Sequence, residues 1–425
     1  MIEYSIEWNE EGGTRHRTLM EEAYGRIVEE RERGITGYYN LPEDATLVVD
    51  EVEADAANCP ACERAETVVV IGIGGSSLGA KALDRALRPV TRGPIKRMVF
   101  LENPDPLEVS EKFRKIDPDK SLFLVISKSG GTIETTTLFK LAIGYFGLEV
   151  DGKDRERVMV ITDGGSILNR YADRHGLRTY LIPANVGGRF SVLSAVGMVP
   201  LTLAGYDTRA ILAGARRMAE RFFDRREEHL LRKAAFIADR WEQYRMNVLF
   251  AYGTPLEDLT KWYVQLWGES LGKIDAEGRR VGLTPMGHIG SIDQHSFLQL
   301  IIEGPRDKTV TFLKIDHFDP ELVIPDITLE HIEKNDYVNG HTLGTLLDAE
   351  CDATMESIRE QGVPVDSIVM DRVSPENLGE LILYYELLTS AVGALLKIDT
   401  YNQPGVELGK RILVKKFRDK GSQKV

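Results

Sequence analysis

The chain has 425 residues, of which 43% are hydrophobic and 28% charged, a composition typical of a globular protein with room for two domains. Its net charge is −13 and it has no long basic tract, so no nucleic-acid partner is expected. It shows neither an apolar run of membrane-spanning length nor a signal-peptide pattern after Met1, so we expect no membrane partner and a cytoplasmic location.

The N-terminal part is polar, and residues 14–34 have the pattern of an exposed or partly packed helix, so residues 1–45 are expected to form a helical extension. From residue 67 onward, short β-branched runs alternate with helical patterns, as in right-handed βαβ units around a parallel sheet. The expected strands are Thr67–Ile73, Met98–Leu101, Leu122–Ile126, Val158–Ile161 and Thr179–Ile182, with helices near 77–88, 105–115, 132–146 and 165–174.

Helical patterns dominate after Ser191, but strands recur, which indicates a second α/β unit. We therefore predict an α/β fold with a first domain at 46–205 and a second at 206–425, and a ligand crevice between them. The second set of expected strands is Asn247–Tyr252, Thr309–Ile315 and Ser367–Met370, with helices near 191–204, 208–222, 227–245, 343–361, 375–396 and 405–417.

A glycine-rich segment follows the first expected strand. It resembles a dinucleotide-binding fingerprint only superficially, because Ser77 stands where the third glycine is needed and Glu102 is the only acidic candidate for a ribose contact. Gly75 and Ser76 would instead form a backbone pocket with a hydroxyl at a helix start. This suits a sugar hydroxyl or a phosphate, and a purely structural tight turn is the alternative.

The segment 125–135 is the most informative, because an apolar strand runs into a turn rich in serine, glycine and threonine and then into a helix. A helix N-terminus offers unpaired N–H groups to an anion. The hydroxyls of Ser127, Ser129, Thr132 and Thr135 add donors that fit a phosphate monoester. A Walker pattern is absent, so the segment predicts a site for a small phosphorylated metabolite.

Two later segments carry charged side chains. Arg189 follows two glycines at a strand–helix junction, where a lone arginine is usually a solvated charge. Its position at the same sheet edge as the other glycine turns favours a functional role. Gln265 and Glu269 are four residues apart and share a helical face near Trp267. Glu269 is a candidate general base, and a surface glutamate at a helix end is the alternative.

His295 lies near the start of an amphipathic helix and is preferred to His288, because a helix N-terminus favours a neutral imidazole able to exchange protons. Lys410 belongs to the motif at 399–410, which leads into the last helix. Cys59 and Cys62 form Cys-Pro-Ala-Cys, which is half of a zinc site that no other residues complete. We expect two incidental thiols on a loop and no metal.

Taken together, these segments resemble the phosphoglucose isomerase family, in order from Gly72 to Lys410. The most specific matches are Gly-Gly-Arg-Phe-Ser at 187–191 and Tyr-Asn-Gln-Pro-Gly-Val-Glu-Leu-Gly-Lys at 401–410. The resemblance implies two sugar-isomerase domains, each an α-β-α sandwich with a mainly parallel sheet. It also implies an aldose–ketose isomerase that interconverts glucose 6-phosphate and fructose 6-phosphate, in glycolysis and gluconeogenesis, without a cofactor.

The resemblance implies roles for individual residues. Glu269 would move a proton between C2 and C1, and Arg189 would stabilise the enediolate. His295 and Lys410 would assist ring opening, with the histidine supplied by a neighbouring subunit, so a homodimer with shared active sites is expected. The expected contacts to the phosphorylated hexose are Gly75, Ser76, Ser127, Lys128, Ser129, Gly130, Gly131, Thr132, Thr135, Gln265 and Gln403.

Two alternatives stay open at this point. One is a related phosphosugar isomerase with dual glucose and mannose specificity. The other is a non-catalytic phosphosugar sensor, which would keep the phosphate turn and lose the base. The presence of Glu269, Arg189, His295 and Lys410 disfavours the sensor.

Overall fold

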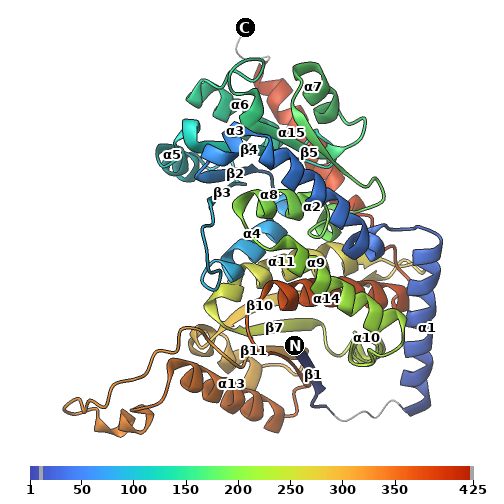
Figure 1. The fold of residues 1–425 in the computed structure, drawn as a ribbon. Helices are drawn as coiled ribbons and strands as arrows, with labels where there is room; N and C mark the ends of the chain where they lie inside the picture. The colour runs from blue at the N-terminus through green and yellow to red at the C-terminus, as the bar shows by residue number, and fades with distance from the viewer. Residues whose placement is uncertain (9–12, 422–425) are drawn as a thin grey trace.

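Two five-stranded sheets organise the chain in the computed structural model, which describes residues 1–8 and 13–421 (Figure 1). In the first sheet all neighbouring strands are parallel. In the second sheet one edge strand is antiparallel and the remaining neighbours are parallel. The expected α/β class with mainly parallel sheets is confirmed.

The strand order of both sheets shows crossover connections. From edge to edge, the first sheet consists of β3 (Arg97–Leu101), β2 (Thr67–Ile71), β4 (Ser121–Ile126), β5 (Val158–Asp163) and β6 (Arg178–Ile182). The second consists of β1 (Ile2–Ile6), β12 (Val365–Met370), β11 (Lys308–Ile315), β7 (Met246–Tyr252) and β10 (Thr284–Gly290). A separate small hairpin pairs β8 (Lys273–Ile274) with β9 (Arg280–Val281).

The central strands β2, β4 and β11 are buried along their whole length because helices cover both faces of each sheet. In β2, for example, Val68 and Val70 belong to one core while Val69 and Ile71 belong to another. The outer face of the first sheet is covered by α5 (Pro106–Arg114), α6 (Ile133–Phe146) and α7 (Ile167–His175).

The two sheets share a middle layer of helices whose side chains form one continuous core. The outer face of the second sheet packs against α12 (Leu298–Glu303) and α13 (Leu343–Glu360). The middle layer consists of α2 (Leu41–Ala57), α4 (Leu78–Leu87), α8 (Ala195–Ala204), α9 (Thr208–Phe223), α10 (His229–Arg240), α11 (Glu257–Leu271) and α14 (Pro375–Leu395) (Figure 1).

The N-terminal segment contains more than the expected helix. β1 pairs antiparallel with β12 and forms an edge of the second sheet, although the sequence did not indicate a strand there. α1 (Gly13–Glu32) buries Ala23 and Ile27 and packs against α10 and α14. The division of the chain at residues 45 and 205 remains a prediction, and β1 joins the N-terminus to the second sheet across it.

Cys59 and Cys62 lie at the first turn of α3 (Pro60–Arg64) and are joined in a disulfide. Their Cα atoms are 5.1 Å apart, because a spacing of three brings the two residues onto one helical turn. The expectation of two incidental thiols on a loop is therefore wrong. The third cysteine, Cys351, is free and buried in the core of the second sheet.

α14 is, among the described residues, the one helix long and apolar enough to cross a membrane, and 94% of that stretch is buried inside the protein. It packs against α9, α10 and α11 as a central core helix. The helix also carries Glu386, which is fully buried, with no hydrogen-bond partner for either carboxylate oxygen in the described part of the chain. Burial raises the pKa of Glu386 well above its ordinary value.

We expect Glu386→Gln to stabilise the fold at neutral and alkaline pH. The unfolded chain loses the proton of Glu386 at about pH 4.3, whereas the folded chain keeps it. Above that pH, folding must take up a proton, which destabilises the wild type by about 1.4 kcal/mol per pH unit until the folded-state pKa is reached. Glutamine does not titrate, so urea unfolding should show the variant gaining stability over the wild type as the pH rises above about 5.

The matched control is Glu356→Gln, since Glu356 is an exposed glutamate on α13. This variant should follow the wild-type pH dependence of unfolding. An equal gain in both variants, or a gain for Glu386→Gln that does not grow with pH, would contradict the assignment of a buried protonated carboxyl.

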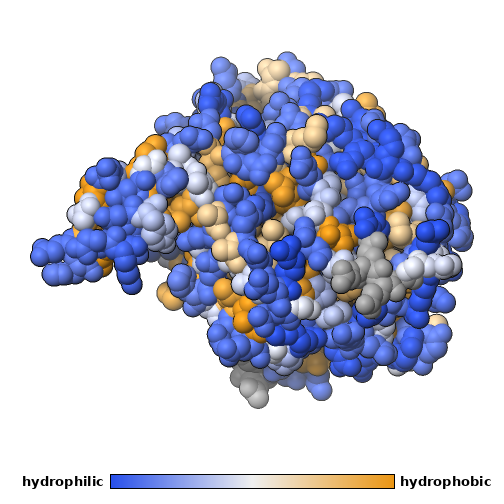
Figure 2. All heavy atoms as spheres, turned by 90° about the horizontal axis from the view of Figure 1, so that it is seen from below, coloured by the Kyte–Doolittle hydropathy of each residue, from blue (hydrophilic) through white to orange (hydrophobic). Residues whose placement is uncertain are grey.

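Residues 316–342, between β11 and α13, form an arm that extends from the body of the protein (lower left in Figure 1, left in Figure 2). The amide of Ile324 donates to the carbonyl of His341 at 2.8 Å and holds its two limbs together. The arm carries the short helix η8 (Glu333–Val338). Apolar side chains along it are exposed to solvent, namely Leu322, Val323, Ile327, Leu329 and Tyr337.

Candidate functional site

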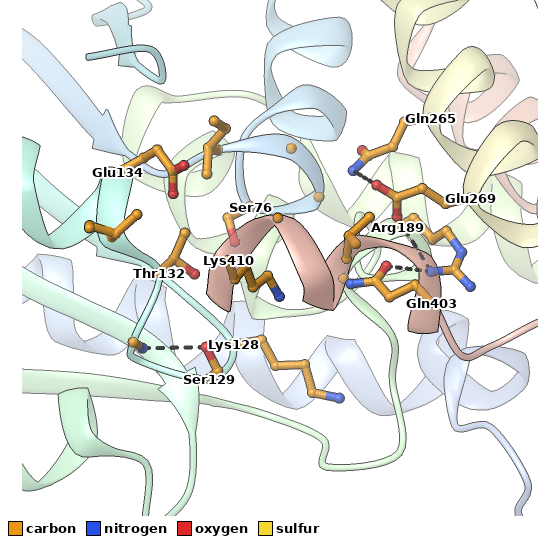
Figure 3. A pocket seen from close by; sticks show the side chains of 18 of the residues that line it. Ser76, Lys128, Ser129, Thr132, Glu134, Arg189, Gln265, Glu269, Gln403 and Lys410 are labelled. Carbon is orange, nitrogen blue, oxygen red and sulfur yellow. Dashed lines mark hydrogen bonds and ion pairs between the residues drawn. The ribbon is translucent and has the colours of Figure 1, made fainter. Parts of the chain in front are cut away.

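A pocket of about 740 Å³ lies where the first sheet, α11 and the C-terminal helix α15 (Glu407–Gly421) meet (Figure 3). The turns that follow β2 and β4 contribute to it, as expected for the carboxyl edge of a parallel sheet. The predicted site residues that line it are Gly75, Ser76, Lys128, Ser129, Gly131, Thr132, Arg189, Gln265, Glu269, Gln403 and Lys410.

The turn after β2 forms η2 (Gly74–Ser76), and its glycines permit a close backbone contact. Gly74 adopts a φ of +60°, a conformation that favours glycine. A Cβ on Gly75 would lie 2.3 Å from the carbonyl carbon and oxygen of Gly188. The two glycine turns therefore touch through their backbones, and Ser76 and Gly188 both face the pocket.

The turn after β4 leads directly into α6. The hydroxyls of Ser127 and Thr132 are 3.0 Å apart, and the amide of Gly131 donates to Ser129 Oγ at 3.3 Å. Thr132 is the N-cap of α6, but its side chain makes no capping hydrogen bond. The turn thus presents hydroxyls and the first amides of a 14-residue helix next to the pocket, which suits an anionic ligand.

Three predicted residues in this turn and the first turn of α6 do not line the pocket. Ser127 and Thr135 are buried, each with 1% exposure. Gly130 has a φ of +71°, and a Cβ there would lie 2.6 Å from the amide nitrogen of Leu168. Their contacts shape the turn, and the adjacent residues face the pocket.

Lys128 lines the pocket, and its ammonium binds the segment that precedes η5 (Gly188–Phe190). Its Nζ donates to the carbonyl oxygens of Ala184 at 2.8 Å and Val186 at 2.7 Å. The same ammonium lies 3.9 Å from a carboxylate oxygen of Asp163. Lys128 therefore joins the turn after β4 to the turn that carries Arg189.

Arg189 belongs to η5 and is 3% exposed. Its Nε donates to Ser270 Oγ at 2.7 Å, and its Nη2 donates to the carbonyl oxygens of Thr400 at 2.6 Å and Asn402 at 3.0 Å. Burial lowers the pKa of Arg189, and the Glu269 carboxylate acts in the opposite direction. The fixed fork of donors holds the guanidinium in one orientation.

The other side of the guanidinium faces the pocket. Nη1 donates to Gln403 Oε1 at 2.9 Å and to Glu269 Oε2 at 3.4 Å. Glu269 Oε1 accepts from Gln265 Nε2 at 3.3 Å (Figure 3). The Glu269 side chain is 35% exposed. Its carboxylate is therefore accessible to a ligand although two neighbours hold it in place.

α15 completes one wall of the pocket with Lys410 and the apolar residues Leu413 and Val414. Lys410 Nζ donates to Glu407 Oε1 at 2.7 Å, and the Lys410 side chain is exposed. The helix follows η9 (Pro404–Val406), and Pro404 lies in the first turn of η9, where its missing N–H leaves no hydrogen bond unmade.

His295 is the one predicted catalytic residue that the structure does not bring to the pocket. It ends η7 (Ile292–His295), after β10, and its side chain is exposed. His288 is packed instead, stacked on Phe297 and 3.3 Å from a carboxylate oxygen of Asp293. In the described part of one chain, no histidine lines the pocket.

The pocket contains residues that the sequence analysis did not select. Gly74 belongs to the glycine-rich segment after the first strand and Gly188 to the motif at 187–191, so both could have been found from the glycine pairs themselves. Glu134 and the apolar residues of α15 carried no distinguishing signal. Within residues 1–8 and 13–421, no three His, Cys, Asp or Glu side chains are grouped so that they could hold a metal ion.

Comparisons with known proteins agree on one family. A family model described as phosphoglucose isomerase matches residues 43–424. The glucose-6-phosphate isomerase of Campylobacter jejuni is 41% identical over 389 residues, covering 91% of this chain and 93% of its own length. That of Rubrobacter xylanophilus is 38% identical over 426 residues, covering 95% of this chain and 94% of its own length.

Solved structures show the same fold. A Thermus thermophilus protein described as hypothetical superposes with a TM-score of 0.90 at 35% identity, covering 98% of this chain and 100% of its own. A glucose-6-phosphate isomerase from Chlamydia trachomatis superposes with a TM-score of 0.81 at 23% identity, covering 99% and 89%.

Proposed function

Since this chain belongs to the phosphoglucose isomerase family and so interconverts glucose 6-phosphate and fructose 6-phosphate, we propose that its pocket does so by ring opening and proton transfer through a cis-enediolate. Isomerisation removes the proton on C2 of the aldose and returns it to C1 of the ketose. The reaction needs an anion site, a proton shuttle and a cation beside the developing oxyanion. Each has a candidate in the pocket.

The phosphate would bind at the turn that follows β4. Ser129, Thr132 and the first amides of α6 supply hydrogen-bond donors, and the positive end of the helix dipole favours the dianion. Ser76 and Gly75 would contact the sugar or the phosphate from the neighbouring turn. This local arrangement offsets the repulsion expected from a net charge of −13.

Glu269 would move the proton between C2 and C1. Its carboxylate is partly exposed in the pocket, and Gln265 and Arg189 orient it through long hydrogen bonds that leave its oxygens accessible. Arg189 would stabilise the enediolate, because its buried guanidinium is fixed in place before the charge develops. Gln403 would orient both the guanidinium and the substrate.

His295 and Lys410 would assist ring opening, and the histidine would come from a second copy of the chain. The exposed side chain of His295, away from the pocket of its own chain, supports a shared site. The apolar side chains of the arm (residues 316–342) support the same proposal, because a surface of this kind favours burial against a partner. The proposal includes a cytoplasmic homodimer without nucleic-acid or membrane partners.

The observation that carries the proposal is the convergence of Arg189, Gln265 and Glu269 beside a helix N-terminus in one pocket. The test is a coupled assay of purified, chelator-treated protein with glucose 6-phosphate. We expect fructose 6-phosphate to form, with turnover unchanged by the chelator. Mannose 6-phosphate as the substrate distinguishes a dual-specificity isomerase. Phosphosugar binding without turnover would favour a sensor and contradict the proposal.

Mixing two inactive variants is expected to restore activity if the site is shared. A heterodimer of Glu269→Gln and His295→Ala has one site with both changes and one site with neither. Random reassembly of the two variants should therefore yield about one quarter of the wild-type activity. The measurement is the coupled assay after co-refolding of equal amounts.

The control is the pair Glu269→Gln and Lys410→Ala, whose altered residues line the pocket of one chain. Each site of this heterodimer keeps one damaged residue, so mixing should restore nothing. If heterodimers form and activity recovers in neither mixture, the proposal that His295 is shared between subunits is contradicted.

A further inference from the structure

Lys273 is a charged residue beside the pocket to which the proposed mechanism assigns no role. It follows α11 by two positions and begins β8. Its Nζ donates to the carbonyl oxygen of Glu269 at 2.7 Å and to that of Ser270 at 3.0 Å. The side chain therefore folds back onto the end of the helix that carries the proposed base.

The carbonyls that Lys273 binds belong to the last turn of α11. The last four carbonyls of an α-helix have no intrahelical partner, and the partial negative charge there favours a cation. The amide of Gly272 donates to the carbonyl of Gly268 at 3.2 Å. The ammonium of Lys273 supplies donors to the next two carbonyls, so it caps the helix end.

The backbone of Lys273 is itself fixed by the β8–β9 hairpin, in which Lys273 pairs with Val281. Asp275 closes this hairpin. Its Oδ1 accepts from the amides of Glu277 at 3.1 Å and Arg279 at 2.8 Å, and its Oδ2 accepts from Arg279 Nε at 2.7 Å. Lys273 is thus anchored at its backbone and reaches the helix with its side chain.

Two groups of the proposed site lie on the turn that Lys273 caps. One is the carboxylate of Glu269, and the other is the hydroxyl of Ser270, which accepts from Arg189 Nε at 2.7 Å. A shift of this turn would move the base and remove a support of the guanidinium together. A misplacement of about 1 Å can cost roughly 100-fold in rate.

We propose that Lys273 is a positioning residue of this site. By binding the carbonyls of Glu269 and Ser270 it fixes the last turn of α11, and through that turn it fixes the Glu269 carboxylate and the contact with Arg189. The inference rests on the proposed isomerase function and gives Lys273 no contact with the substrate.

The charge state of Lys273 makes this support pH-dependent. Burial lowers the pKa of Lys273 to about 8, and the Arg189 guanidinium of η5 adds to this effect. Asp399, ahead of η9, and Glu269 on α11 act in the opposite direction. Below about pH 8 the charged ammonium binds the carbonyl oxygens strongly, and above it the attraction weakens, so kcat should decline as the pH rises through this value.

The experiment compares Lys273→Met and Lys273→Arg with the wild type, using glucose 6-phosphate from about pH 6 to about pH 9. For Lys273→Met at neutral pH, kcat should fall about 10- to 100-fold while KM stays within about threefold, and the alkaline decline should be absent. Lys273→Arg should recover most of kcat and lose the decline, because a guanidinium donates to the same carbonyls without titrating.

Lys261→Met is the matched control, since Lys261 is a lysine on α11 that pairs with Glu257 at 2.9 Å, outside the pocket. Its kcat and pH profile should equal those of the wild type. A Lys273→Met enzyme with wild-type kcat, or one that loses only thermal stability, overturns the proposal and leaves the isomerase function intact.

A wild-type protein without turnover of glucose 6-phosphate contradicts the proposed function instead, so the two failures are distinguishable. If Lys273→Met does not fold, the pH profile of Lys273→Arg tests the role of Lys273. A decline that stays near pH 8 in Lys273→Arg shows that another group titrates, and it rejects the role of Lys273.

Discussion

Replacing Glu269 by glutamine is expected to lower kcat by about 10³-fold or more while substrate binding changes by less than about threefold. Glutamine has the same shape, and its Oε1 can still accept from Gln265 or Arg189, so the pocket should keep its geometry. It cannot accept the C2 proton. The measurement is kcat by the coupled assay together with the Kd for fructose 6-phosphate by calorimetry.

The matched control for this experiment is Glu257→Gln. Glu257 stands at the start of the same helix, where it pairs with Arg85 and Lys261 away from the pocket. Its replacement should leave kcat unchanged. If Glu269→Gln keeps more than about a tenth of the wild-type kcat, another group carries the proton, since general-base loss costs at least about 10²-fold.

Replacing Arg189 by lysine should lower kcat/KM by about 10³-fold and also destabilise the fold by about 1–3 kcal/mol. Three nitrogens of the guanidinium donate to Ser270, Thr400, Asn402, Gln403 and Glu269. An ammonium cannot reproduce this planar fork, so buried acceptors lose their donors and the cation moves away from the enediolate. Both effects are measurable, one by the coupled assay and the other by urea unfolding.

Arg209→Lys provides the comparison. Arg209 is a half-exposed arginine that pairs with Asp50 and Glu53 on the surface, where such contacts contribute little. It should retain wild-type stability and kcat/KM. An Arg189→Lys variant as active as Arg209→Lys would remove Arg189 from the proposed mechanism.

The central strands of the first sheet were predictable because they are buried on both faces. β2 and β4 are apolar after one polar residue at the start of each, and their observed bounds differ from the expected ones by two residues at most. β10 was missed because Pro285, Gly287 and Gly290 interrupt its apolar pattern. α2 was also missed, although Leu41, Ala45, Val49 and Val52 have the spacing of a buried helical face.

The candidate site was predictable where a motif implies its own local geometry. The turns at 74–76 and 127–132 could be predicted from a strand, glycines and a following helix alone. The environment of Arg189 was not predictable in this way, since its acceptors on Thr400 and Asn402 come from more than 200 residues further along the chain. Lys273 carried no signal at all, because its partners are backbone carbonyls, which every residue possesses.

The contact between the two glycine turns has a consequence for redesigning the enzyme. At Gly75 an added methyl group would collide with main-chain atoms, so no exchange of a neighbouring side chain can relieve it. At Gly188 the corresponding direction is empty within 4 Å, and the backbone has an ordinary conformation. A library that seeks new sugar specificities can therefore vary the residue at Gly188, whereas the position of Gly75 accepts no residue other than glycine.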